Sequence, residues 1–183
     1  MNVISIPEID NAYIISMQQN IDSRGVLIEI FKSNVTTRLQ GWEQFTSAQV
    51  NWVSSTKGSI RGIHRTKKEF PQMKILFCAN GEIADHLVDL RPHSKTYKNH
   101  IEILLSGFDQ NCLLIPEGVG HGFQTLSETS EVLYFMSRSY NLLEELTINP
   151  EDPSLSINWR KPYILSSKDK SAPLLENIEK SLF

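Results

Sequence analysis

The sequence predicts an all-β fold, either a sandwich or a barrel of short strands. Segments rich in Ile, Leu, Val and aromatic residues recur along most of the chain, and Gly, Pro, Asn, Asp and Ser separate them as turns separate strands. The spacing of apolar residues that is typical of helices is almost absent. The predicted strands cover residues 27–33, 48–54, 74–80, 82–90, 100–107, 112–118 and 131–140.

Length and composition predict one domain. The chain has 183 residues, of which 40% are hydrophobic and 21% are charged, so it can bury a core of ordinary size. We therefore expect a single domain over residues 1–183. Short helices are expected at 34–40 and 174–181. Residues 150–183 follow no clear pattern and are expected to form a C-terminal extension.

The charge balance excludes some classes of partner. The net charge is −3, from 18 Lys and Arg against 21 Asp and Glu, and this lack of a basic excess argues against a nucleic-acid partner. No apolar run approaches the roughly 20 residues of a membrane span, so no membrane partner is expected.

The N-terminus has no basic start and no apolar stretch typical of a secretory signal. Cys78 and Cys112 lack metal or redox spacing. We therefore expect a cytoplasmic protein with two buried thiols.

The segment PEGVGHGF, which begins at Pro116, fits the pattern P-x-G-x-x-H. Gly118 and His121 occupy its other fixed positions. The pattern resembles the second sequence signature of cupin β-barrels, in which a tight turn delivers a histidine from the start of a strand into the mouth of the barrel. The resemblance implies a cupin-type jelly-roll β-barrel with a few short helices, mainly near the C-terminus.

The histidine spacing argues against a metal site. Metal-binding cupins use an H-x-H pair and an upstream glutamate, so that three histidines and one carboxylate surround the metal. No second histidine follows His64 at that spacing, and His86, His93 and His100 are seven residues apart. We therefore expect no metal and no other cofactor. A metal-dependent cupin oxygenase or isomerase is the alternative.

Three basic side chains are candidates for chemistry on an anionic substrate. Arg61 and His64 lie three residues apart in GSIRGIHRT, which is expected to be a loop, and Lys74 begins the next predicted strand. Histidine is the natural general base near neutral pH. Arginine suits bidentate contact with phosphate, and lysine supplies a point charge. The alternative is that a lone loop histidine is structural.

Two tyrosines near the end of the last predicted strand are further candidates. Tyr134 and Tyr140 are six residues apart, and an even separation in a strand places both rings on one face. They are either two core aromatics, or one is a proton donor and the other a stacking platform.

Together these motifs resemble one family, the nucleotide-sugar 3,5-epimerases typified by dTDP-4-dehydrorhamnose 3,5-epimerase. The resemblance covers most of the chain, in order and at family-like spacings, and the ordered set is highly specific although no single segment is. The matching segments are DSRGVLIE (22–29), QVNWVSSTKGSIRGIH (49–64), PQMKILFCANGE (71–82), LVDLR (87–91), PEGVGHGFQTLSE (116–128), YFMSRSYN (134–141), DPSLSINW (152–159) and LSSKDKSAP (165–173).

The resemblance implies a cofactor-independent epimerisation of a dTDP-linked 4-keto-6-deoxyhexose. The C4 ketone acidifies the hydrogens on C3 and C5. By resemblance, His64 is the general base, Asp169 pairs with it, and Tyr134 is the acid that returns a proton to the opposite face. Lys74 is expected near the C4 oxygen, where enolate charge develops, and His121 is a second histidine of the pocket.

The resemblance also implies binding residues and a homodimer. Arg61 is expected to meet the diphosphate, with Gln49 and Asn51 nearby, and Tyr140 to stack on the thymine. Two residues of DSRGVLIE match positions that reach the nucleotide of the partner subunit, namely Arg24 and Glu29. The expected assembly is therefore a homodimer with a shared nucleotide site.

The sequence departs from the family pattern at several positions. Arg65 and Thr66 replace the usual aromatic and Gln after the catalytic histidine, Ala84 and His86 stand where the pattern has an aromatic and Val, and Leu142 replaces a Pro. These positions are expected to lie near the sugar pocket, so a single-centre 3- or 5-epimerase of another deoxysugar pathway is an alternative to the double 3,5-epimerase. A non-catalytic sugar-nucleotide binder is a third possibility.

Overall fold

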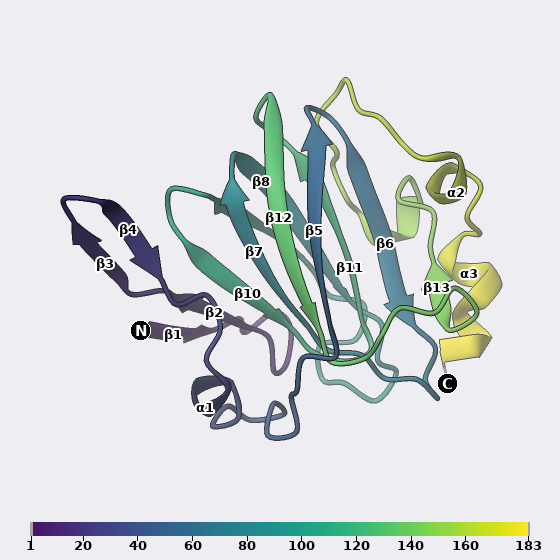
Figure 1. The fold of residues 1–183 in the computed structure, drawn as a ribbon. Coiled ribbons are helices and arrows are strands. Elements are labelled where there is room, and N and C mark those ends of the chain that lie inside the picture. Colours follow the sequence, from purple (N-terminus) through teal and green to yellow (C-terminus); the bar gives the residue numbers. More distant parts are fainter. Residues whose placement is uncertain (1, 183) are drawn as a thin grey trace.

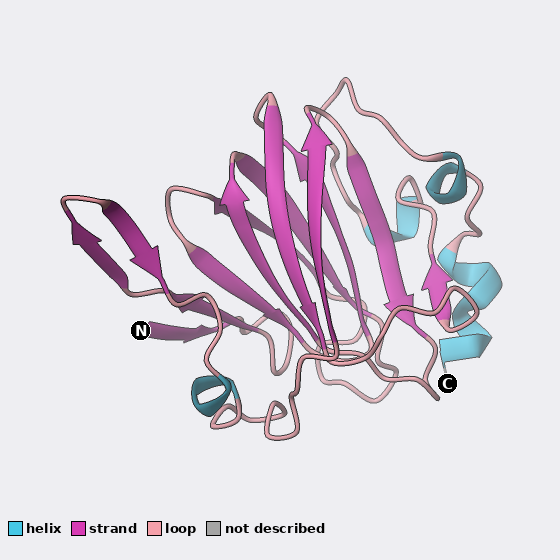
Figure 2. Ribbon diagram, in the orientation of Figure 1, coloured by secondary structure: helices cyan, strands magenta, loops and turns pink. Residues whose placement is uncertain are grey.

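The described residues form two β-sheets that face each other and one small separate hairpin (Figures 1 and 2). The computed structural model describes residues 2–182. The strands are β1 (Asn2–Ser5), β2 (Tyr13–Ser16), β3 (Gln19–Asp22), β4 (Gly25–Ile28), β5 (Gln49–Thr56), β6 (Ile60–Thr66), β7 (Lys74–Asn80), β8 (Glu82–Asp89), β9 (His100–Ser106), β10 (Asn111–Ile115), β11 (Val119–Thr125), β12 (Thr129–Met136) and β13 (Glu145–Thr147). The helices are α1 (Ser33–Thr36), η1 (Pro153–Leu155), α2 (Ser167–Lys170), α3 (Leu175–Ile178) and η2 (Glu179–Leu182).

The strand order confirms the predicted jelly-roll class. One sheet has the order β1-β2-β10-β7-β12-β5 and the other the order β13-β6-β11-β8-β9, while β3 and β4 pair only with each other. Neighbouring strands are antiparallel. Within residues 2–182 the ladder hydrogen bonds stay inside each sheet, so the barrel is flattened into two layers. No helix in this range is long and apolar enough to cross a membrane.

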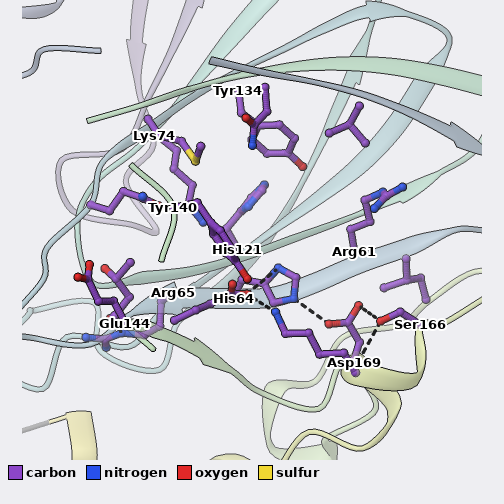
Figure 3. Close-up of a pocket in the computed structure, with 18 of the residues that line it drawn as sticks. Arg61, His64, Arg65, Lys74, His121, Tyr134, Tyr140, Glu144, Ser166 and Asp169 are labelled. Atoms are coloured by element: carbon purple, nitrogen blue, oxygen red, sulfur yellow. Dashed lines mark hydrogen bonds and ion pairs between the residues drawn. The ribbon is translucent and has the colours of Figure 1, made fainter. Parts of the chain in front are cut away.

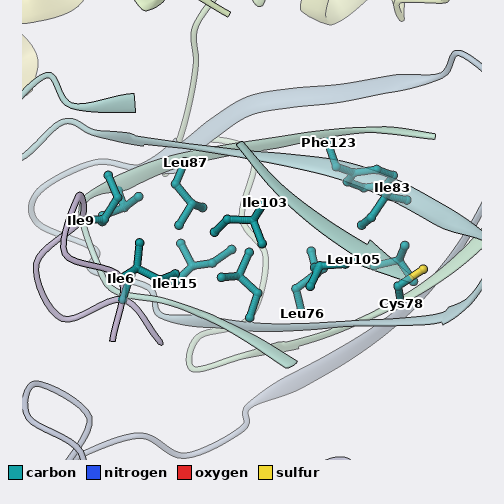
Figure 4. Packing of buried hydrophobic residues seen from close by; sticks show 14 residues of the cluster. Ile6, Ile9, Leu76, Cys78, Ile83, Leu87, Ile103, Leu105, Ile115 and Phe123 are labelled. Carbon is teal, nitrogen blue, oxygen red and sulfur yellow. The ribbon is translucent and has the colours of Figure 1, made fainter. Parts of the chain in front are cut away.

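The space between the sheets is filled at one end by apolar side chains (Figure 4). Alternate residues of each strand point inward, as the two-residue period of a strand requires. Ile83 and Leu87 of β8 thus meet Leu76 of β7, and all three are fully buried. Burial of this kind contributes roughly 1.5–3 kcal/mol per large side chain. The core fixes the distance between the sheets and leaves their other end free to form a cavity.

The C-terminal segment covers the outer face of the five-stranded sheet (Figure 1). Trp159 and Leu175 of this segment pack against Val88 and Leu90, the residues of β8 and its end that face away from the core. The Trp159 indole also donates a hydrogen bond to the Pro150 carbonyl at 2.7 Å. Docking of this segment brings α2, which could not be predicted from the sequence pattern, to the edge of the sheet where β6 lies.

Several predicted elements are confirmed and others are wrong. Strand 74–80 matches β7, and the predicted strands at 48–54, 82–90, 100–107, 112–118 and 131–140 overlap β5, β8, β9, β10 and β12. The predicted strand 27–33 is wrong beyond residue 28, where β4 ends. The predicted helix 34–40 is reduced to the single turn of α1, and 174–181 holds α3 followed by η2. The predicted loop at 58–66 is wrong, because residues 60–66 form β6.

Close approach of two strands explains why the sequence of β6 does not have the apolar pattern that is typical of a strand. β6 and β11 pair, and at Gly62 an added Cβ would lie only 2.4 Å from the Gly122 Cα. Gly62 also has φ +141°, which side chains rarely allow. Glycines are therefore required where apolar residues would signal a strand. The close pairing places His64 directly opposite His121.

Candidate active site

A cavity of about 550 Å³ opens between the two sheets (Figure 3). The six-stranded sheet and the five-stranded sheet each supply part of its wall, and the loop after β12 and the segment around α2 complete the wall. Most of the predicted site residues line it, namely Asn51, Arg61, His64, Lys74, His121, Tyr134, Tyr140 and Asp169. The other three, Arg24, Glu29 and Gln49, do not.

His64 and Asp169 form a hydrogen-bonded pair although 105 residues separate them. The His64 Nε2 and Asp169 Oδ1 atoms are 2.7 Å apart. Burial opposes ionisation of the Asp169 side chain, but hydrogen bonds from His64 and Ser166 outweigh it and hold the pKa of this carboxyl below its ordinary value. Since an ionised carboxylate only accepts, Nε2 carries the hydrogen of this bond. Nδ1 is then the nitrogen with a free lone pair.

A second carboxylate, which the sequence analysis missed, lies on the other side of the same ring. Glu145 Oε1 is 3.7 Å from His64 Nδ1 and 2.8 Å from Lys168 Nζ. Burial raises the pKa of Glu145, but the charge of His64 and hydrogen bonds from Lys168 and Tyr140 lower it below its ordinary value. Glu145 thus places a second negative charge beside the ring. The signal in the sequence was weak, because paired glutamates at 144–145 also suit a solvated loop.

Tyr134 faces this pair from the opposite sheet. It belongs to β12 of the six-stranded sheet, whereas His64 belongs to β6 of the five-stranded sheet. Its ring contacts the edge of the His121 ring, with 5.9 Å between centroids. Burial, assisted by the charge of Asp85, raises the pKa of the Tyr134 phenol well above its ordinary value. The phenol is therefore held protonated and can act as a proton donor.

Lys74 and His121 complete the inner wall of the cavity. Burial lowers the pKa of Lys74, and the charges of Glu145 and Asp85 oppose this shift. A hydrogen bond of 2.8 Å joins His121 Nε2 and Asp85 Oδ2, and both side chains are nearly inaccessible to solvent. Burial also lowers the pKa of His121 despite this partner. Within residues 2–182, Asp85 Oδ1 has no hydrogen-bond partner.

The outer part of the cavity is built from β5, β6 and the loop after β12. Arg61 is steadied by a hydrogen bond from its Nε to Ser55 Oγ at 3.0 Å. Gln49 lies behind the wall, where its amide donates to Asn51 Oδ1 and accepts from the Tyr140 backbone N–H, both at 2.8 Å. Gln49 therefore positions Asn51 and Tyr140 rather than lining the cavity.

The predicted geometry of the two tyrosines is wrong in one respect. β12 ends at Met136, so Tyr140 lies in the following loop and the alternation of strand residues does not apply to it. Both rings nevertheless line the cavity. Burial, assisted by a hydrogen bond from the Tyr140 hydroxyl to Glu145 and by the charge of that carboxylate, raises the pKa of this phenol.

Arg24 and Glu29 lie away from the cavity of their own chain. Arg24 belongs to the tip of the β3–β4 hairpin, which projects from the sheets in Figure 1, and pairs with Asp22 at 2.6 Å. Glu29 follows β4 and pairs with Lys32. The structure therefore does not bring these two predicted binding residues together with the others.

Three of the positions that depart from the family pattern do not line the cavity. Ala84 and His86 are buried, and His86 packs edge-on against Trp159 at 4.4 Å between ring centroids. Leu142 is exposed in the loop after β12 and also lies outside the cavity lining. The structure therefore places these three positions outside the cavity wall: alternate residues of β8 point outward, and Leu142 lies in the loop after β12 next to Asn141, which does line the cavity. Arg65 and Thr66 do line the cavity.

His86 and His100 form a second histidine pair outside the cavity. Their Nδ1 and Nε2 atoms are 3.0 Å apart and their rings are stacked. Burial and the neighbouring His100 lower the pKa of His86 to about 4. Across residues 2–182, His, Cys, Asp and Glu side chains form no group of three or more that could hold a metal ion.

Comparison with known proteins assigns the chain to a family. The family model for dTDP-4-dehydrorhamnose 3,5-epimerase matches residues 7–177. The chain belongs to this family. The dTDP-4-dehydrorhamnose 3,5-epimerase of Salmonella typhimurium is 37% identical over 157 residues, which cover 85% of each chain. The chain is therefore an epimerase in the isomerase class.

Solved structures of family members show the same fold. The epimerase RmlC of Legionella pneumophila, solved with dTDP-4-keto-L-rhamnose, has a TM-score of 0.92 at 33% identity and covers 100% of this chain and 96% of its own. The 3'-monoepimerase ChmJ of Streptomyces bikiniensis, solved with dTDP-quinovose, has a TM-score of 0.87 at 29% identity, with 98% and 90% covered. Double and single epimerases thus share the architecture of this chain.

Proposed function

We propose that this epimerase inverts C3, C5 or both in a dTDP-4-keto-6-deoxyhexose without a cofactor, as a step of deoxysugar biosynthesis. One observation carries the proposal. The His64–Asp169 pair and the protonated Tyr134 lie on different sheets across one cavity, so a base and an acid can reach opposite faces of a sugar ring. Inversion by proton transfer can use two such groups, one that removes a proton from one face and one that delivers a proton to the other.

The base half of the reaction follows from the protonation states. Asp169 accepts the hydrogen on His64 Nε2, and Nδ1 takes the proton from carbon C3 or C5. The electron pair of the broken C–H bond moves into the ring to form an enolate on the C4 oxygen. Lys74 is the cation assigned to that oxygen, where a fixed positive charge stabilises the transition state more than the ketone. The imidazolium that forms lies between Asp169 and Glu145.

The acid half returns a proton from the other face. Tyr134 donates its phenolic proton to the carbon as the enolate collapses back to the ketone, and the centre is inverted. The phenolate that results lies beside His121, and the charge of Arg61 favours it. Because burial disfavours the phenolate, it takes up a proton from solvent, and the His64 imidazolium releases to solvent the proton that it accepted, so both groups are restored for the next cycle.

The outer part of the cavity suits the nucleotide half of the substrate. Arg61 supplies a planar cation for the diphosphate, and the exposed ring of Tyr140 supplies a surface on which thymine stacks. Asn51 also lines the cavity and offers a neutral amide. Both cysteines are free and buried, which supports a cytoplasmic location for the reaction.

Deuterium exchange tests the proposed reaction and counts the inverted centres. The purified protein is incubated with the dTDP-4-keto-6-deoxyhexose in D₂O, and incorporation at C3 and C5 is followed by NMR. Exchange at both carbons indicates a double epimerase, and exchange at one carbon indicates a single-centre enzyme. Absence of exchange at either carbon would contradict the proposed function and favour a protein that only binds the sugar nucleotide.

We also propose that the enzyme is a homodimer in which each subunit completes the nucleotide site of the other. The β3–β4 hairpin exposes apolar side chains, with Ile21 74% accessible, and the edge strand β5 exposes Trp52 at 62%. Edge strands and apolar surfaces of this kind are typical of interfaces. Arg24 on the hairpin is fully outside its own cavity and is available to a partner's cavity.

A complementation experiment tests the shared site. Arg24→Glu and His64→Ala proteins are each expected to have little activity, because one lacks a binding cation and the other lacks the base. After subunits are exchanged, the mixed dimer has one site with both intact residues. Random mixing in equal amounts therefore predicts a recovery to about a quarter of wild-type activity. Failure to recover activity in mixtures shown to contain mixed dimers would mean that Arg24 serves its own chain or none.

A further inference from the structure

Ser166 makes hydrogen bonds behind the His64–Asp169 pair that have no role in the mechanism proposed so far. Ser166 lies immediately before α2, and its hydroxyl donates to Asp169 Oδ2 at 2.9 Å. The same Oγ accepts the Asp169 backbone N–H at 3.1 Å. The two oxygens of Asp169 are thus divided, with Oδ2 on Ser166 and Oδ1 on His64. We propose that Ser166 is a positioning residue that sets the orientation of Asp169 and, through it, the tautomer of His64.

The reasoning begins with the freedom of the carboxylate. The terminal torsion of an aspartate is broad, so a carboxylate with one partner can rotate away from it. A second hydrogen bond from Ser166 to Oδ2 restricts this rotation and keeps Oδ1 directed at His64 Nε2. The ring then keeps its hydrogen on Nε2 and presents the lone pair of Nδ1. The other tautomer, with hydrogen on Nδ1, has no lone pair there to accept a proton from carbon.

The local sequence explains why a serine can do this. α2 is one turn long, from Ser167 to Lys170, and Ser166 is its N-cap. An N-cap serine normally bonds the backbone N–H three residues later, which here is that of Asp169. The Asp169 side chain is thereby brought close to the hydroxyl of Ser166. One hydroxyl thus serves the helix end as acceptor and the carboxylate as donor.

The helix transmits the effect of the cap to both sides of the imidazole ring. Asp169 contacts Nε2, and Lys168 of the same turn holds Glu145, which lies 3.7 Å from Nδ1. A loosened first turn therefore disturbs both carboxylates that flank His64. This inference rests on the proposed role of His64 as base, but the hydrogen bonds on which it depends exist without substrate.

Four variants separate positioning from helix stability. Ser166→Ala removes the hydroxyl and the cap, whereas Ser166→Gly removes the hydroxyl at a position that tolerates glycine almost as well as serine. Ser166→Thr keeps a hydroxyl and is the conservative rescue. Ser167→Ala is the matched control, since this neighbouring serine makes no bond to Asp169 in the described structure.

The first measurement is spectroscopic and needs no substrate. The hydrogen shared by His64 Nε2 and Asp169 gives a far-downfield proton resonance, which is assigned by its absence in His64→Gln. We expect this resonance to move upfield or broaden in Ser166→Ala and Ser166→Gly, and to persist in Ser166→Thr and Ser167→Ala. An unchanged resonance in Ser166→Gly would overturn the proposal. Because no turnover is involved, this result is independent of whether the proposed function holds.

The second measurement is kinetic. We expect kcat to fall about tenfold in Ser166→Gly with KM nearly unchanged, since a hydrogen bond to a charged group that orients the base is lost but no substrate contact is. In an Asp169→Asn background the same substitution is expected to have little further effect. Equal losses in the two backgrounds would show that Ser166 acts through general stability, and the proposal would be wrong.

Discussion

The buried His86 makes the stability of the protein depend on pH in a way that can be measured. His86 is 1% exposed and packs against Trp159, the residue that anchors the C-terminal segment to β8. The titratable and charged groups that face it are His100 and Glu102 on β9, Arg160 in the C-terminal segment and His121 on β11. This environment excludes water and offers only one carboxylate, so it opposes protonation of the ring.

The magnitude follows from the pKa difference between the folded and unfolded chain. Burial first, and then the charges of His100 and Arg160, lower the pKa of His86 from 6.5 to about 4 in the folded protein, against the opposing effect of Glu102. The unfolded chain takes up the proton near 6.5 and the folded protein does not. The contribution of the neutral His86 ring to the free energy of unfolding is therefore complete above pH 6.5 and is lost as the pH falls toward 4. Linkage gives a loss of about 2 kcal/mol between pH 7 and pH 5, and about 3 kcal/mol in full.

The assay compares urea unfolding of wild type and His86→Gln at these two pH values. Glutamine does not titrate, so the free energy of unfolding of the variant is expected to fall by about 2 kcal/mol less than that of the wild type. His93→Gln, a substitution of an exposed histidine, is the control and is expected to follow the wild type. If wild type and His86→Gln lose equal stability on acidification, then His86 is protonated in the folded protein and the reasoning is refuted.

Three further predictions follow from the cavity and the strand packing. Tyr134→Phe is expected to keep solvent exchange at the face of the base and to lose net inversion, and NMR of the sugar in D₂O measures both. If the variant instead loses dTDP binding, then the roles proposed for Tyr134 and Tyr140 must be exchanged. Lys74→Met is expected to lower kcat by about 10²–10³-fold with a small change in KM, because the enolate loses its cation; an unchanged kcat would place this lysine away from the C4 oxygen. Gly122→Ala is expected to lower the free energy of unfolding in urea by about 1–3 kcal/mol, since the added Cβ would lie 2.8 Å from the Ile63 Cδ1 and 2.9 Å from the Arg61 carbonyl oxygen. If the variant is as stable as the wild type, then β6 and β11 can move apart to accommodate the methyl group.

The strands that build the core were predictable from their composition, whereas β6, which carries His64, was not. β7 contains a run of apolar residues, and β8 carries Ile83 and Leu87 into the core, so the composition of both segments indicates a strand. β6 and β11 instead contain glycines at their closest approach and polar side chains that face the cavity. A functional site needs glycines and polar side chains at positions where a core strand has apolar residues. The apolar pattern that predicts a strand is therefore missing from the strands that line the site.

The partners of His64 were beyond any local pattern. The resemblance pointed to Asp169, but the irregular segment after residue 150 gave no physical reason to bring it to β6. That reason is the packing of Trp159 and Leu175 on the outer side of β8, which places α2 at the sheet edge. Glu145 was missed for a related cause, because β13 is only three residues long and pairs with β6.

The positions that depart from the family pattern separate into two groups with different consequences. Ala84 is buried and His86 packs against Trp159 of the C-terminal segment, so neither borders the cavity. Arg65 donates hydrogen bonds to the Leu90 and Thr66 carbonyls, which directs its charge into the protein although the residue borders the cavity. Thr66 therefore remains as a small side chain at the wall where the pattern has Gln. We therefore expect the number of centres inverted to depend on how the sugar ring is held at this wall.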